Sequence, residues 1–153
     1  MDPNRLTQKA QEAIQHAQSL AQGNGHPQIE AEHLAIALLS QDEGVASRLV
    51  EKAGGSPSAL VQRLQQALGR LPRVSGPAGA PGQVYISPRV NEVLNAAEAE
   101  AQRMKDEYVS VEHLLLALAD MTDGAVADAL RAAGLTREKL LEAAAAVRGG
   151  QRV

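Results

Sequence analysis

The stretches "EAEHLAIAL" (residues 30–38) and "SVEHLLLAL" (residues 110–118) are two versions of one pattern, eighty positions apart in a chain of 153 residues. Each version places a Glu-His pair at the start of an apolar run. Because apolar residues occupy nearly every position of the run rather than a single stripe, we expect each run to form a buried helix. The doubled pattern predicts a core built around two equivalent helices.

The similarity extends over both halves of the chain. An ungapped alignment of residues 7–67 with residues 87–147 repeatedly brings identical residues together, for example Ala53-Gly54 with Ala133-Gly134. Matches at turn positions as well as apolar positions indicate an internal repeat rather than a shared composition. We therefore expect two copies of one structural unit.

Each half predicts four helices. The first follows a hydroxyl cap, the second is the apolar run, the third lies between two glycines, and the fourth opens at a further Ser or Thr. No alternating apolar and polar run predicts a sheet. The fold class is all-α, with eight helices in two pseudo-twofold four-helix repeats. The residues that carry the boundary signals are Thr7, Gly44, Gly54 and Ser56 in the first half and Ser87, Gly124, Gly134 and Thr136 in the second.

Residues 71–86 separate the two repeats and are rich in glycine and proline, which predicts an irregular linker. Repeat one is expected to span residues 7–70 and repeat two residues 87–148. We expect residues 1–148 to form one domain.

Composition excludes several classes of protein. Aromatic residues make up 1% of the chain and the net charge is −3, so bulk charge does not favour nucleic acid or an anionic membrane. The absence of cysteine excludes disulfides and thiolate metal sites. No apolar run reaches the roughly 18 residues that span a bilayer, and the N-terminus lacks a signal-peptide pattern. A cytoplasmic location is the resulting expectation.

Catalytic motifs are also absent. The sequence contains no phosphate-binding loop, no HExxH zinc motif and no GxSxG nucleophile elbow. His33 and His113 could form a metal site across the pseudo-twofold axis, but the favoured interpretation is a buried imidazole that satisfies backbone groups near a helix start. We therefore expect no catalytic residue and no metal ligand in this chain.

Glu32 and Glu112 allow two interpretations. A carboxylate in the first turn interacts favourably with the helix dipole, and it could also serve as an anionic recognition group beside an apolar groove. Asp106 should lie near Glu112 if the preceding turn is tight. Tyr108 is either a packed side chain or an anchor for a partner.

The doubled "EHLxxAL", the opening "RLTQKAQEAIQHAQSLA" (residues 5–21) and the join "QQALGRLPRVSG" (residues 65–76) resemble the Clp amino-terminal repeat domain of large hexameric chaperone ATPases. Residues 67–74 and 147–150 resemble the disaggregase branch of that family in particular. The resemblance covers essentially the whole chain.

This resemblance implies a client-binding domain that catalyses nothing itself and holds no cofactor. Residues 149–153 would begin a linker to ATPase modules outside this chain, where ATP and Mg²⁺ would bind. The full-length protein would be a homohexamer that works with a DnaK-type chaperone system. Its clients would be unfolded or aggregated proteins.

The family's polar client-handling positions match Thr7, Asp106 and Glu112. Its apolar groove is lined by the first two helices of the second half, where Ala96, Glu100 and His113 stand at positions that larger apolar groups can occupy. Groove depth and client preference therefore stay open. The residues expected at the client site are Thr7, Val93, Ala96, Ala97, Glu100, Asp106, Tyr108, Glu112 and His113.

The alternative is an adaptor-docking domain or a receptor for a degradation signal, as in the ClpC-like unfoldase branch. In that case Glu32 and Glu112 would each receive the guanidinium of a phosphoarginine. A structural cap on a hexamer is a third possibility, which no feature of the sequence requires.

Overall fold

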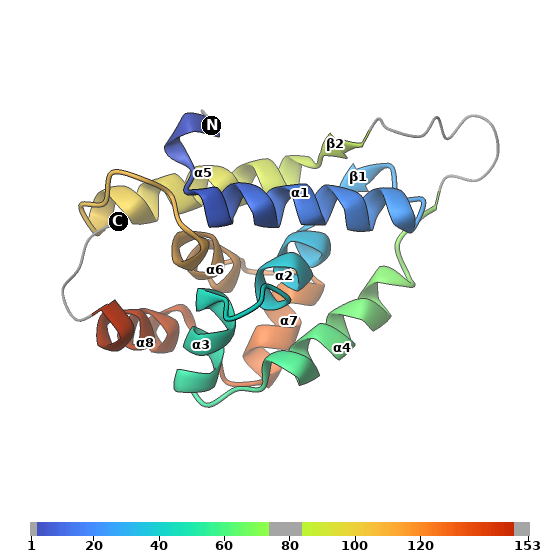
Figure 1. The fold of residues 1–153 in the computed structure, drawn as a ribbon. Helices are drawn as coiled ribbons and strands as arrows, with labels where there is room; N and C mark the ends of the chain where they lie inside the picture. Colours follow the sequence, from blue (N-terminus) through green and yellow to red (C-terminus); the bar gives the residue numbers. More distant parts are fainter. Residues whose placement is uncertain (1–2, 74–83, 149–153) are drawn as a thin grey trace.

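The computed structural model describes residues 3–73 and 84–148, and these residues fold almost entirely into helices (Figure 1). The predicted eight helices in two four-helix repeats are confirmed within these ranges. A 3-10 turn, Pro3–Arg5, precedes the first helix. The helices are α1 (Gln8–Gly23), α2 (Ala31–Leu39), α3 (Val45–Lys52), α4 (Pro57–Leu68), α5 (Pro88–Arg103), α6 (Val111–Ala119), α7 (Ala125–Ala132) and α8 (Arg137–Arg148).

The helix ends follow the predicted signals. The Thr7 hydroxyl accepts a hydrogen bond from the Ala10 N–H at 3.2 Å, and Ser87 does the same for Val90 at 3.1 Å. Such caps satisfy backbone donors that have no partner inside the helix. Gly54 and Gly134, which follow α3 and α7, have φ values of 96° and 73°, a region that glycine enters without strain.

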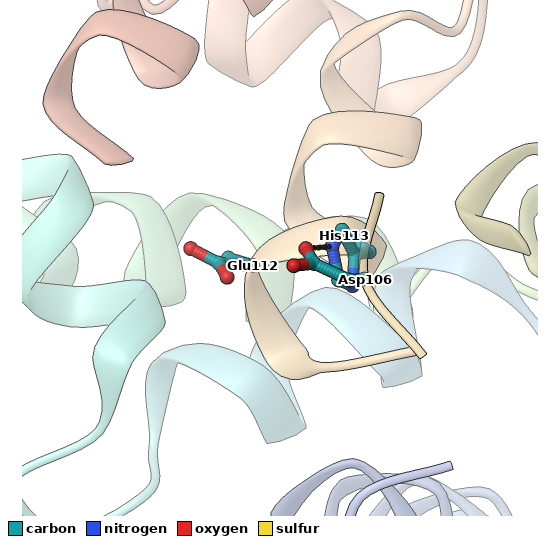
Figure 2. A group of neighbouring side chains, drawn as sticks. All are labelled: Asp106, Glu112 and His113. Carbon is teal, nitrogen blue, oxygen red and sulfur yellow. Dashed lines mark hydrogen bonds and ion pairs between the residues drawn. The ribbon is translucent and has the colours of Figure 1, made fainter. Parts of the chain in front are cut away.

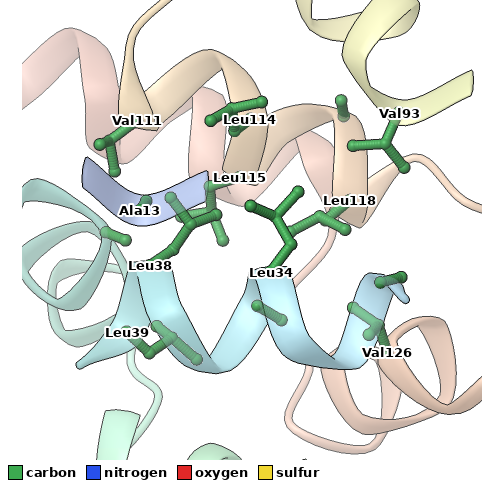
Figure 3. Packing of buried hydrophobic residues seen from close by; sticks show 14 of the residues in the cluster. Ala13, Leu34, Leu38, Leu39, Val93, Val111, Leu114, Leu115, Leu118 and Val126 are labelled. Atoms are coloured by element: carbon green, nitrogen blue, oxygen red, sulfur yellow. The ribbon is translucent and has the colours of Figure 1, made fainter. Parts of the chain in front are cut away.

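The two doubled stretches form the centre of the molecule. Figure 1 places α2 and α6 between the long helices α1 and α5 on one side and α3, α4, α7 and α8 on the other. Leu34 and Leu38 of α2 lie opposite Leu115 and Leu118 of α6, in one continuous core shared by both halves (Figure 3). The buried face of α1 consists of four alanines, which allow close packing against α2: Ala10, Ala13, Ala17 and Ala21.

Short strand pairings also join the halves, and the expectation of no sheet is wrong in this respect. Strand β1 (Gln28–Ile29) pairs in parallel with strand β2 (Tyr85–Ile86), and Leu6 forms a parallel bridge with Val109. Leu6 and Ile86 are eighty positions apart, as are Ile29 and Val109. The segment before the first helix of each half therefore pairs with the bend of the other half.

Pairings of two residues are too short to produce an alternating sequence pattern, so the sequence carried no sign of them. Strand β2 lies inside the predicted linker, residues 71–86, and ties its end to the first repeat. Residues 74–83 of that linker, and the predicted tail 149–153, lie outside the described residues. Within the described ranges, no helix is both long and apolar enough to span a membrane.

Candidate functional site

The bend between α5 and α6 positions Asp106. Lys105 adopts a left-handed conformation with a φ of 60°, and the Asp106 N–H donates to the Ala101 carbonyl at 2.9 Å. This geometry turns the chain back so that the Asp106 side chain, in a residue only 6% exposed, lies beside the first turn of α6. The first half uses the same turn, with Gly25 at a φ of 70° before His26.

His113 connects this bend to the start of α6. Its Nδ1 accepts a hydrogen bond from the Ser110 N–H at 2.8 Å, so Nε2 carries the ring proton and donates to Asp106 Oδ2 at 2.7 Å (Figure 2). The ring is fully buried, and burial lowers its pKa against the opposing effect of Asp106. The expected burial of this imidazole against a backbone group near a helix start is confirmed.

Arg148, the last residue of α8, reaches both carboxylates of this cluster. Its Nη2 lies 2.7 Å from Asp106 Oδ2 and its Nε lies 2.9 Å from Glu112 Oε1, with 13% of the arginine side chain exposed. The Glu112 contact is an ion pair rather than an aligned hydrogen bond. Burial raises the pKa of Glu112, while Arg148 acts in the opposite direction. The expected proximity of Asp106 and Glu112 is confirmed.

Asp106, Glu112 and His113 also have the spacing of a possible metal site, since one ligand atom of each lies within 4.8 Å of the others. The donors are already engaged, however. The Nε2 of His113 faces Asp106, and the guanidinium of Arg148 contacts both carboxylates. A metal ion would have to displace an internal cation, so the cluster is built as an ion-pair network.

Glu100 forms a second internal network. It is 2% exposed, and its two oxygens accept hydrogen bonds from Arg137 at 2.5 and 2.6 Å, with Arg103 adding a third at 2.6 Å. The bonds from Arg137 hold the pKa of Glu100 below its usual range. Arginines of α5 and α8 therefore cover Glu100, which does not line the pocket that contains Val93.

A groove lies at the other end of α5 and α6. Val93 and Ala96 line a pocket of about 270 Å³ whose apolar floor includes Ala117 and Met121. Charged side chains surround this floor, and none of the Asp106 cluster belongs to it. The charged lining residues are Arg89, Glu92, Asp120 and Asp123.

The remaining expected residues are placed separately. Ala97 is fully buried in the core, whereas the Tyr108 residue is 45% exposed. Thr7 caps α1, and its N–H donates to the Val109 carbonyl at 3.0 Å, which places it next to Tyr108 in space. The structure thus separates the expected client residues: two line the groove, three form the buried Asp106 cluster, and the other four lie elsewhere.

Glu32 and Glu112 occupy equivalent positions in different surroundings. Glu32 is partly buried and lines a groove of about 330 Å³ together with Arg63 and Arg70. Burial raises its pKa. Glu112 is enclosed and paired with Arg148, so the two glutamates are not twin sites in this structure.

Sequence reasoning missed Arg137 and Arg148, which carry the ionic networks, and His26, which hydrogen-bonds His33 across 2.8 Å. The repeat register holds a signal for two of them. It aligns His26 with Asp106 and Leu68 with Arg148. The second half therefore has an acid and an arginine at two positions where the first half has a histidine and a leucine.

Two four-helix units that share a pair of central helices define the class of this protein as an all-α repeat domain. The family model of the Clp repeat N-terminal domain matches residues 5–133, so the chain belongs to this family. A curated relative, the chaperone protein ClpB of Nitratidesulfovibrio vulgaris, is 43% identical over 154 residues. That match covers 100% of this chain but 18% of the relative, so the chain spans about a fifth of its length.

Solved structures show the same fold. The Hsp104 N-terminal domain from Candida albicans superposes with a TM-score of 0.80 at 26% identity, covering 96% of this chain and 93% of that one. The ClpV N-domain in its complex with a VipB peptide has a TM-score of 0.70 at 19% identity, covering 97% and 89%. The curated and structural relatives thus include chaperones of the ClpB and Hsp104 type.

Proposed function

We propose that this chain is the client-binding amino-terminal domain of an ATP-dependent hexameric disaggregase of the ClpB type. The match of the whole chain to a ClpB chaperone supports this proposal. In the full-length protein, ATP and Mg²⁺ would act in ATPase modules outside this chain, in the cytoplasm and together with a DnaK-type system. This domain would bind exposed apolar segments and perform no catalysis.

The observation that carries the proposal is the groove with Val93, Ala96, Ala117 and Met121 at its floor and charges of both signs around it. An apolar client side chain buried there would contribute roughly 1.5–3 kcal/mol. Ordering an extended segment offsets much of that gain, so binding is weak. Weak binding suits transient capture before threading. The complex of the ClpV N-domain with a peptide is consistent with a peptide-binding role for this fold.

A titration followed by backbone NMR tests the groove. An unfolded apolar polypeptide should shift the amide signals of residues 89–96 and 117–123, and Ala96→Glu should abolish those shifts by filling the groove with a charge. His16→Glu, at the repeat-equivalent position on the exposed face of α1, is the matched control. Unchanged binding by Ala96→Glu would exclude the groove as the client site.

One observation favours the alternative, a receptor for phosphoarginine. Glu32 could take the guanidinium of the modified residue while Arg63 or Arg70, which line the same groove, take its phosphate. On this proposal Glu32→Gln loses binding of a phosphoarginine peptide and Glu112→Gln keeps it, because Arg148 already occupies Glu112. Binding that depends on both glutamates would contradict the single-site version.

A further inference from the structure

Helix α8 is held at both ends by arginines that reach buried carboxylates. Arg137, its first residue, bonds Glu100 of α5, and Arg148, its last, contacts Asp106 and Glu112. The ten residues between them separate the two arginines by roughly 16 Å of helix. Along that length α8 packs against α6 of its own half and α3 of the other.

The equivalent helix of the first half, α4, has neither ion pair. Pro57 and Leu68 stand where α8 has Arg137 and Arg148, and α4 buries the larger set of apolar side chains. The buried residues are Leu60, Leu64, Ala67 and Leu68 in α4, but Leu140, Ala143 and Ala144 in α8.

The difference is largest at the C-terminal turn. Ala67 is 7% exposed, whereas its counterpart Val147 is 43% exposed. Apolar contact therefore anchors the end of α4, and the end of α8 depends on Arg148. A helix with fewer buried apolar contacts opens locally at a lower free energy than its neighbours.

We propose that α8 is a detachable strap, which shields Asp106 and Glu112 when docked and leaves as a unit while the rest of the domain stays folded. Its release exposes two carboxylates beside Tyr108, the surface on which the client site was expected. The undocking follows from the contacts of α8 alone. Only its purpose, access of clients to Asp106 and Glu112, rests on the proposed function.

Native-state hydrogen exchange on the whole chain tests the strap, with α4 as an internal reference. In the wild type, amides of residues 141–148 should exchange at least about tenfold faster than those of residues 61–68. Arg148→Met should accelerate exchange in α8 by about a hundredfold and leave it faster than exchange in α4. Arg131→Met, which removes an exposed arginine contact at the end of α7, is the control that should alter neither helix.

A second measurement reports the shielding itself. Carbodiimide coupling, followed by mass spectrometry, should modify Asp106 and Glu112 slowly in the wild type and at least about tenfold faster in Arg148→Met. If α4 and α8 exchange at the same rates in the wild type, the helices open only together and the strap is excluded. That comparison holds even if the variant does not fold. If α8 opens but client binding in Arg148→Met is unchanged, the strap stands and the role of these carboxylates in client capture fails.

Discussion

The two halves of this domain meet one requirement with different chemistry. His33 and His113 each accept a hydrogen bond at Nδ1 from the N–H three residues earlier, at 2.8 Å in both cases. The ring N–H at Nε2 then faces His26 in the first half, at 2.8 Å, and Asp106 in the second, at 2.7 Å. The repeat has kept a buried imidazole that must be satisfied, while the identity of its partner differs.

That partner decides whether the half contains a buried charge. A neutral imidazole beside His33 needs no counter-ion, and Leu68 closes the first half with apolar contact. A carboxylate beside His113 does need one, because an unpaired buried charge is costly. Arg148 supplies it from the position equivalent to Leu68. Ion pairs therefore hold the last helix of the second half in place, whereas apolar packing holds the last helix of the first half.

The largest expected effect comes from giving the second half the first half's residues. Asp106→His should cost about 3 kcal/mol of unfolding free energy, because Arg148 loses a buried partner. Arg148→Leu alone should cost a similar amount, since Asp106 and Glu112 lose their cation. In the double variant Arg148→Leu removes the cation that Asp106→His leaves without Asp106, and Asp106→His removes one of the two carboxylates that Arg148→Leu leaves unpaired, so the cost should fall below the sum. Urea unfolding of the four proteins measures this cycle.

Additive costs would show that Asp106 and Arg148 act independently, and the contrast between an ionic and an apolar closure would then fail. Leu68→Met changes the matching position of the first half but keeps its apolar character. This variant should cost less than about 1.5 kcal/mol of unfolding free energy. Its cost is the reference for the costs of Asp106→His and Arg148→Leu.

The next effect concerns pH and the first half. Burial, with a smaller contribution from His26, lowers the pKa of His33 to about 4. The unfolded chain therefore binds more protons between pH 6.5 and pH 4, so this residue's contribution to stability is present above pH 6.5 and is lost as the pH falls towards 4. From pH 7 to pH 5 the loss attributable to His33 is about 2 kcal/mol.

Urea midpoints across this pH range test the sign and the size. His33→Gln should flatten the profile, whereas His16→Gln, which changes an exposed residue of α1, should leave it as it is. A steeper fall in stability on acidification in His33→Gln would contradict the assignment. Burial also lowers the pKa of His26 and His113, so both add to the slope in the same direction.

The contrast between the halves also explains how much of the fold and of the candidate site the sequence could predict. The repeat, the four helices of each half and the caps at Thr7 and Ser87 rest on local signals, and all were predictable. The partners of Asp106 were not, because Arg148 is 42 residues away and only the packing of α8 brings it near. Likewise, Glu100 carries no sign in the sequence that Arg137 covers it.

A smaller effect is expected at Glu100, whose counterpart in the first half is Leu20. Glu100→Leu removes the acceptor for Arg137 and Arg103, but these arginine side chains are 22% and 62% exposed and can turn to water. The cost should be about 1–2 kcal/mol, less than at Asp106. Urea unfolding measures it, and a loss as large as that of Asp106→His would mean that exposure of the cation does not explain the difference.

The smallest effect separates a structural from a functional role for Thr7. Its hydroxyl caps α1 as Ser87 caps α5, so Thr7→Ala and Ser87→Ala should each cost about 1 kcal/mol. The Ser87 cap is the more deeply buried, and its loss should be the larger of the two. Thr7→Ser keeps the hydroxyl and should restore the stability lost in Thr7→Ala. If Thr7→Ser is as stable as the wild type but binds an unfolded client more weakly, the Thr7 methyl group contacts the client in addition to the role of Thr7 as a cap.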